Sequence, residues 1–129
     1  MREIKFRAKT ATTNRWVYGH YAFIQGYHVI YEDGEPFVIA LNTLGQYTGL
    51  KDKNGVEICE GDIVTMIVFE DNDEYLGYVV FENGCFCLNI SLDGTKYKVP
   101  ASEWKETETI ITVIGNIYEN PELLEREAG

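Results

Sequence analysis

The chain has 129 residues, 45% of them hydrophobic and 13% aromatic, and a formal net charge of -10 at pH 7. A chain of this length and hydrophobic content can bury a core of its own, which excludes intrinsic disorder. Its start lacks the apolar core of a signal peptide, and no apolar run approaches the ~18 residues of a membrane span, so we expect a cytoplasmic protein with no membrane partner.

The first part of the chain is predicted to form strands. Residues 3–9 alternate apolar with charged side chains, the period of a strand that packs one face. Trp16–Phe23 is rich in aromatic and branched residues, which predicts a strand buried on much of both faces. Further strands are expected at Tyr27–Tyr31 and Phe37–Leu41.

The dipeptide Asp33-Gly34, between these last two segments, predicts a two-residue turn with positive φ at both positions. Pro36 lacks a backbone N–H, so it restricts this hairpin to the edge of a sheet. A second hairpin is predicted at residues 79–88, VVFENGCFCL, with a type I′ turn at Asn83-Gly84.

The turn at Asn83-Gly84 also predicts the register of its hairpin. Four opposed pairs are expected: Glu82 with Cys85, Phe81 with Phe86, Val80 with Cys87 and Val79 with Leu88. We assign Val79, Phe81, Phe86 and Leu88 to the core face. Cys85 and Cys87 then lie on the opposite face.

The remaining segments complete a β-rich pattern. Strands are expected at Asp62–Phe69, Tyr97–Val99 and Ile110–Tyr118, with an acidic turn at residues 70–74. Asn120-Pro121-Glu122 has the residue types of a helix start, so a short C-terminal helix is expected. The predicted fold is mainly β: an SH3-like small barrel over residues 59–129, a β-rich N-terminal extension over residues 1–58, and one compact unit overall.

Residues 47–64, YTGLKDKNGVEICEGDIV, combine two bends, one at residues 52–55 and one at Gly61-Asp62. The chain resembles the YopX-type proteins of temperate phages and prophages at EIKFRA (residues 3–8), GQYTGLKDKNG (residues 45–55), Ile58, EGDIV (residues 60–64) and VIGNIYENPELL (residues 113–124). The resemblance implies a C-terminal SH3-like barrel, a β-rich N-terminal part and a bacterial host cell. It implies no particular activity.

Histidine and cysteine residues that could bind a metal are present, but their spacing is not that of a zinc site. The soft metal ligands are His20, His28, Cys59, Cys85 and Cys87. The Cys85–Cys87 pair lies inside a strand, whereas zinc sites draw cysteine pairs from turns with wider spacing. Along a strand these two residues are about 6.6 Å apart, too far for an unstrained disulfide, so free thiols are expected.

The sequence also lacks the motifs of calcium-binding and phosphate-binding sites. The acidic residues 70–74 lack the glycine and the spacing of a calcium loop, and no phosphate-binding loop occurs. The sequence therefore predicts no catalytic residue, no metal and no cofactor, and a protein that is not an enzyme.

Charge is divided unevenly along the chain. Residues 1–15 hold five of the eleven basic side chains and one acid, so this segment is about +4 and the remainder about -14. A strongly negative surface repels phosphate, which disfavours direct nucleic-acid binding. A basic strand face would instead lie against acidic surface of the same chain or of a second copy, which favours a homo-oligomer.

The leading hypothesis is a non-enzymatic phage accessory protein that binds an unknown protein partner or its own copies. The alternatives are a nucleic-acid-associated regulator and an acidic nucleic-acid mimic that acts on a host protein. The candidate interaction surface comprises Lys5, Arg7, Lys9, Arg15, Tyr47, Lys51, Asp52, Lys53, Asn54, Glu60 and Asp62.

Overall fold

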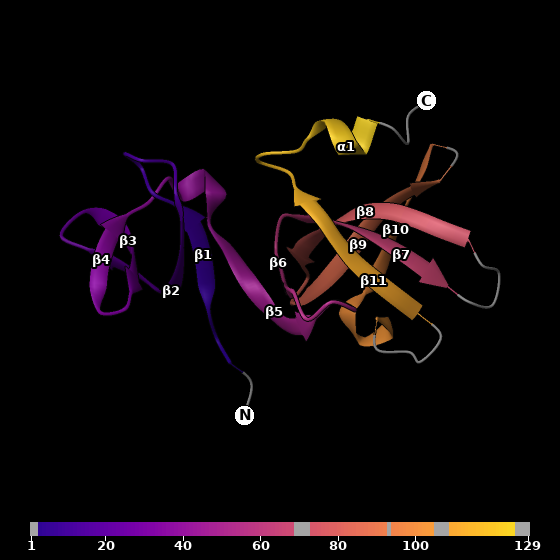
Figure 1. The fold of residues 1–129 in the computed structure, drawn as a ribbon, viewed down its shortest axis with the longest axis horizontal. Helices are drawn as coiled ribbons and strands as arrows, with labels where there is room; N and C mark the ends of the chain where they lie inside the picture. Colours follow the sequence, from indigo (N-terminus) through magenta and orange to yellow (C-terminus); the bar gives the residue numbers. More distant parts are fainter. Residues whose placement is uncertain (1–2, 69–72, 93, 105–108, 126–129) are drawn as a thin grey trace. The chain divides into compact units, whose positions relative to one another are not determined.

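The computed structural model describes residues 3–68, 73–92, 94–104 and 109–125. Over these residues the protein is mainly β, with two antiparallel sheets and one short α-helix. Contacts within the chain divide it into two compact units, Met1–Gly49 and Leu50–Gly129 (Figure 1). This division lies earlier than the sequence-based boundary after residue 58. No helix of the described residues is long and apolar enough to cross a bilayer.

The first sheet has the strand order β4-β3-β2-β1-β5-β6. Its strands are β1 (Phe6–Lys9), β2 (Trp16–Ile24), β3 (Tyr27–Glu32), β4 (Glu35–Val38), β5 (Gly45–Lys51) and β6 (Glu57–Cys59), with a 3-10 turn, η1 (Leu41–Thr43), before β5. The predicted strands in this part are confirmed with two shifts in their bounds. The first begins at Phe6 and not at Glu3. The fourth, predicted at Phe37–Leu41, runs from Glu35 to Val38, and Leu41 already begins η1. Strands β5 and β6 were not predicted.

Two tight turns connect β2, β3 and β4. Asp33 and Gly34 have φ of 51° and 81°, which confirms the predicted turn. Gln25 and Gly26 form a second such turn, with φ of 53° and 84°. Glutamine is not a typical residue for positive φ, so this turn was not predicted.

The outer edge of β4 is closed to strand addition. Pro36 lies in this edge strand, as predicted, and has no N–H to donate. The carbonyl of Val38 already accepts a hydrogen bond from the Ala11 N–H at 2.9 Å. A bridge between Thr10 and Ile39 covers the same edge. The backbone groups that invite a further strand are therefore largely removed or paired.

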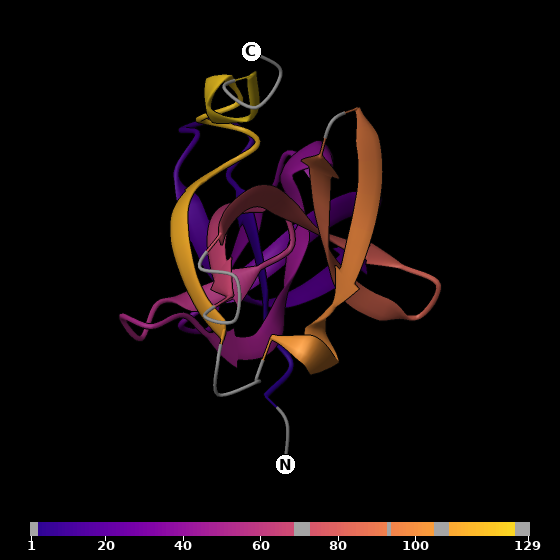
Figure 2. The same ribbon diagram turned by 90° about the vertical axis from the view of Figure 1, so that its right-hand side faces the viewer.

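The second sheet has the order β10-β9-β8-β7-β11. Its strands are β7 (Asp62–Val68), β8 (Asp73–Glu82), β9 (Cys85–Leu92), β10 (Thr95–Pro100) and β11 (Thr109–Asn116). Figure 2 shows β9 and β10 as one antiparallel hairpin, and Figures 1 and 2 together show a strongly twisted sheet. Of the acidic segment predicted as a turn, residues 70–72 lie outside the described residues, and Asp73 and Glu74 already belong to β8.

The β8–β9 hairpin has the predicted register: Phe81 pairs with Phe86 and Val79 with Leu88 across the ladder. Asn83 and Gly84 both have positive φ, as expected. The assignment of Phe81 to the core is wrong, because its side chain is 48% exposed while Leu88 is fully buried. Phe81 lies next to the turn and contacts the Phe86 ring, with ring centroids 4.9 Å apart.

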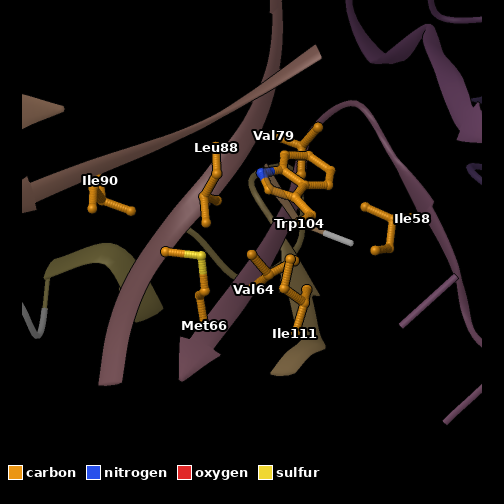
Figure 3. Close-up of a cluster of buried hydrophobic side chains, with 8 residues drawn as sticks. All are labelled: Ile58, Val64, Met66, Val79, Leu88, Ile90, Trp104 and Ile111. Carbon is orange, nitrogen blue, oxygen red and sulfur yellow. The ribbon is translucent and has the colours of Figure 1, made fainter. Parts of the chain in front are cut away.

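One hydrophobic cluster holds the second unit together. Figure 3 shows its buried side chains pointing toward one another, from β6, β7, β8, β9 and β11 and from the loop after β10: Ile58, Val64, Met66, Val79, Leu88, Ile90, Trp104 and Ile111. The Trp104 indole is fixed by a hydrogen bond from its Nε1 to the Val99 carbonyl at 3.0 Å. The first unit has its own, smaller cluster of Ala8, Val17, Ile30 and Ile39.

The chain after β11 turns into the predicted C-terminal helix, α1 (Glu122–Glu125). Asn116 starts this turn, because its Oδ1 accepts the N–H groups of Tyr118 and Glu119 at 3.0 and 2.9 Å. Asn120 then accepts the Asn116 N–H with its side chain at 3.2 Å. The Asn-containing segment that contributes to the family resemblance therefore shapes the backbone at this point.

Candidate functional site

The candidate interaction surface predicted from the sequence divides into exposed and buried residues. Arg15, Lys51, Lys53 and Asn54 are exposed, and Lys5 and Glu60 are half-buried. The remaining five are buried: Arg7, Lys9, Tyr47, Asp52 and Asp62. Placing these five on an outer surface was wrong, because all five are buried within the fold.

The basic side chains of β1 lie against aromatic rings. The Arg7 guanidinium is 4.6 Å from the centroid of the Trp16 ring, and the Lys9 ammonium is 5.5 Å from it. Lys5 lies 5.3 Å from the centroid of the Tyr47 ring in the same way. Such cation–π contacts are stronger where water is excluded, which explains how cationic side chains are accommodated here. The predicted acidic counter-surface is therefore not required to explain the basic face.

Arg15 binds a carboxylate of its own unit. Its guanidinium is 3.1 Å from Glu32, which also accepts the backbone N–H of Tyr18 at 3.0 Å. The Tyr18 N–H and the Arg15 guanidinium lower the pKa of Glu32. Arg15 is thereby engaged with β3, although its side chain remains half exposed.

Asp52 fixes the first bend of the segment 47–64. Its Oδ1 accepts the N–H groups of Asn54 and Val56 at 2.8 and 2.9 Å, and its Oδ2 accepts the N–H of Val113 at 2.9 Å. The Lys53 N–H donates to the Ile111 carbonyl at 3.0 Å. The bend is thereby attached to β11, the strand that the chain reaches about sixty residues later.

The electrostatics of Asp52 match this structural role. Burial acts to raise its pKa, but the three backbone N–H donors outweigh burial and hold the pKa below its ordinary value of 3.8. The side chain therefore stays ionised near neutral pH. A carboxylate with its oxygens engaged by backbone N–H groups is a poor acid or base for catalysis, because a general base near neutral pH needs a raised pKa.

Asp62 and Gly61 fix the second bend. Asp62 is 2% exposed and accepts the Cys59 N–H at 2.8 Å. Gly61 has φ of 89°, and a Cβ added there would lie 2.9 Å from the Tyr118 ring. Its N–H donates to the Val79 carbonyl, and its own carbonyl accepts the Ile117 N–H, both at 2.9 Å. The second bend is thereby attached to β8 and to Ile117, just after β11, so its role in this chain is architectural.

Comparisons with known proteins identify the family of this chain. A model of the YopX protein family matches residues 5–125. The chain belongs to this family. Over 47 residues it is 47% identical to the SPbeta prophage-derived uncharacterized protein YopX of Bacillus subtilis strain 168, which covers 36% of this chain and 34% of the relative. The match thus spans about a third of the length of that curated relative.

A solved structure resembles the whole chain. The crystal structure of protein EF1440 from Enterococcus faecalis is similar with a TM-score of 0.58 and 27% sequence identity, covering 96% of this chain and 99% of the other. The similarity therefore extends over both units of this chain. This structural similarity supports the fold of the chain and does not assign a biochemical role.

An exposed apolar group on the β2–β3 hairpin was missed by sequence reasoning. Phe23 is 62% exposed, Tyr27 59% and Ile24 40%, and we call these three residues the hairpin tip. The prediction that β2 is buried on both faces is wrong at this end. Alternation identified the strand but not which neighbouring elements would cover it, and the hairpin extends past its core cluster.

Neighbouring contacts give the hairpin tip a defined shape. His28 is opposite Phe23 in the ladder, with ring centroids 4.5 Å apart. The His28 ring also lies nearly parallel to the Tyr21 ring, with centroids 5.8 Å apart, and the Tyr21 hydroxyl is 2.5 Å from His28 Nδ1. Phe23 thus contacts the His28 ring, which Tyr21 holds in place, while most of the Phe23 side chain faces water.

The second unit has a groove of about 580 Å³ on its sheet. Its lining is mainly apolar, with Lys98 and Glu103 as the charged members. Among the residues that the structure describes, no group of three His, Cys, Asp or Glu side chains is placed to hold a metal ion.

Proposed function

We propose that the protein is a non-enzymatic accessory protein of a phage or prophage that acts in the bacterial cytoplasm by binding another protein. The observation that carries the proposal is the hairpin tip. Three large apolar side chains exposed at one hairpin are a typical protein-binding feature, whereas single exposed hydrophobic residues are ordinary. Aromatic side chains are also enriched among the residues that dominate binding energy.

The charge distribution supports a protein partner at this position. Residues 1–49 contain five basic and four acidic side chains, whereas residues 50–129 contain six basic and seventeen acidic ones. The hairpin tip thus belongs to the nearly neutral unit. A partner can approach it without the repulsion that the acidic unit would exert on another acidic surface.

We further propose that the five strands of the second sheet form an SH3-like small barrel. The sheet order, the short antiparallel connections and the strong twist support this assignment. Fold alone does not determine function, so the binding proposal depends on the hairpin tip and not on the barrel.

A double variant tests the proposal. Phe23→Ser with Tyr27→Ser removes two exposed rings, so the protein should stay folded while losing its partner. The matched control is Phe81→Ser, which removes a ring of comparable exposure from the other unit. We expect tagged wild type and Phe81→Ser to capture the same host or phage protein from induced cells, and the double variant to lose at least about tenfold in affinity, about 1.4 kcal/mol.

Light scattering distinguishes the form of the partner. If the partner is a second copy, wild type and Phe81→Ser will be oligomeric and the double variant monomeric. Equal capture and equal mass for all three proteins would contradict the role of the hairpin tip.

A second candidate function rests on the acidic second unit. Seventeen acidic side chains within residues 50–129 are suited to occupying a nucleic-acid-binding groove of a host protein. In that case duplex DNA would compete with the protein for its partner, and raised salt would weaken the complex. Retention of the protein on heparin would instead favour a nucleic-acid-associated regulator.

A further inference from the structure

The sulfur atoms of Cys85 and Cys87 lie 3.5 Å apart on β9. The strand brings them together because residues i and i+2 project from the same face. Cys85 is exposed next to the Asn83-Gly84 turn, and its Sγ is 3.6 Å from the Glu82 carbonyl. Cys87, two residues further into the sheet, is buried. The chain therefore presents one accessible thiol with a second directly behind it.

We propose that Cys85 and Cys87 form a reversible dithiol site that reacts with low-molecular-weight disulfides. The Cys85 thiolate attacks one sulfur of the disulfide RS–SR, forms a mixed disulfide and releases one RS⁻. Cys87, after losing its proton to water, attacks the Cys85 sulfur and releases the second RS⁻. The two protein thiols lose two protons and two electrons, which reduce RS–SR to two thiols. This proposal does not depend on the proposed protein partner.

The difference in exposure fixes the order of these two steps. A dissolved disulfide reaches Cys85 but not the buried Cys87. Burial, together with the neighbouring Cys85, raises the pKa of the Cys87 thiol, so Cys87 is a poor nucleophile until a mixed disulfide is placed beside it. The adjacent sulfur then makes the second attack intramolecular, which compensates for the small thiolate fraction.

The spacing along the strand predicts that the product is easily reduced. Residues i and i+2 of an extended strand have Cα atoms about 6.6 Å apart, near the upper limit of about 6.8 Å for disulfides. Bridging them requires β9 to bend, and β9 is held in the middle of three strands by β8 and β10. Strained, exposed disulfides are the labile ones, whereas unstrained buried ones resist reduction by glutathione.

Bending of β9 would displace the residues that lie beside Cys85 and Cys87 on β8 and β10. Val80 and Pro100 are opposite Cys87 on its two sides. On the same face an ion pair joins Lys98 of β10 to Glu82 of β8, across β9. Oxidation would therefore alter the β8–β9–β10 surface, while the core face with Leu88 points the other way.

The test uses the full, reduced protein and oxidised glutathione. Intact-mass measurement should show the wild type losing two hydrogens, with two equivalents of glutathione released, and fragmentation should locate the bridge between Cys85 and Cys87. Cys87→Ala should stop with one glutathione bound, and Cys85→Ala should react at least about tenfold more slowly, because its remaining thiols are buried. Cys59→Ser should behave as wild type.

A glutathione redox buffer then measures reversibility. The bridge should be reduced at a glutathione ratio that leaves a structural disulfide intact. Circular dichroism checks that each variant is folded, and Cys85→Ala alters an exposed residue, so it remains informative if Cys87→Ala does not fold. A wild type that keeps one glutathione, forms no bridge, or bridges through Cys59 would overturn the proposal.

Discussion

Asp52 shows how a single side chain can hold a bend in place. Its two carboxylate oxygens accept three backbone N–H groups, one of them from β11. Removing an acceptor from buried donors costs more than the hydrogen bonds contribute on average, because each donor loses its partner without regaining water. The bend therefore depends on the charge and shape of one residue.

We expect Asp52→Ala to lower the free energy of unfolding by about 2 to 3 kcal/mol, since three N–H groups lose a charged acceptor. Asp52→Asn keeps one acceptor oxygen and should cost less. The matched control is Glu74→Gln, at an exposed acid of the same unit, which should change stability by less than about 0.5 kcal/mol. Urea unfolding followed by tryptophan fluorescence measures all three.

The pH dependence of these variants has a definite sign. The folded-state pKa of Asp52 lies below its ordinary value of 3.8, so the folded carboxylate binds a proton less readily than the unfolded one. The Asp52 carboxylate therefore contributes to the free energy of unfolding above about pH 4, and this contribution is lost as the pH falls through the folded-state pKa. The stability difference between wild type and Asp52→Asn should therefore shrink in acid. A difference that stays constant down to about pH 2 would contradict this role.

At the scale of elements, the β8–β9 hairpin shows that a sequence pattern can predict the turn and the strand register without predicting which side chains are buried. The Asn-Gly turn fixed φ, register and the pairing of Phe81 with Phe86. Alternation then placed Phe81 and Leu88 on one face, yet only Leu88 is buried. Burial depends on how far the hydrophobic core extends along the hairpin. That extent is set by tertiary packing and cannot be read from the local sequence.

We therefore expect Leu88→Ala and Phe81→Ala to differ strongly. Leu88 lies within the cluster of the second unit, so its truncation leaves a cavity and should cost about 2 to 5 kcal/mol. Phe81 loses mainly its ring contact with Phe86, and its truncation should cost about 1 kcal/mol. Chemical denaturation of both variants provides the comparison, and equal losses would mean that the hairpin end is buried in solution.

Other elements were missed for identifiable reasons. Strand β5, GQYTGLK, contains two glycines and no regular alternation, and β6 has three residues, so neither had a strand signal. The carboxylates Asp52 and Asp62 were included in the candidate interaction surface, yet both are buried. Only the folded chain reveals which backbone N–H groups converge on them.

At the scale of the whole molecule, charge is concentrated in one unit. Residues 50–129 carry seventeen acidic and six basic side chains, a net charge of -11, whereas residues 1–49 carry +1. Like charges at this density repel one another within the folded unit, and the repulsion falls with ionic strength.

We expect the melting temperature to rise between about 0.02 and 0.3 M sodium chloride, because the Debye length falls from about 20 Å to below 10 Å. A gain of about 1 kcal/mol would correspond to about 4 °C for a chain of this size. Differential scanning calorimetry at constant pH measures the change. A melting temperature that falls with salt would show that attractive ion pairs outweigh the repulsion.

The closed edge of β4 has a consequence for how the protein behaves at high concentration. Fibril growth by templating needs a row of unsatisfied main-chain groups, and proline together with the Ala11 contact interrupts that row. Copies that accumulate in a crowded cell therefore find no continuous template for an irreversible cross-β aggregate at this edge.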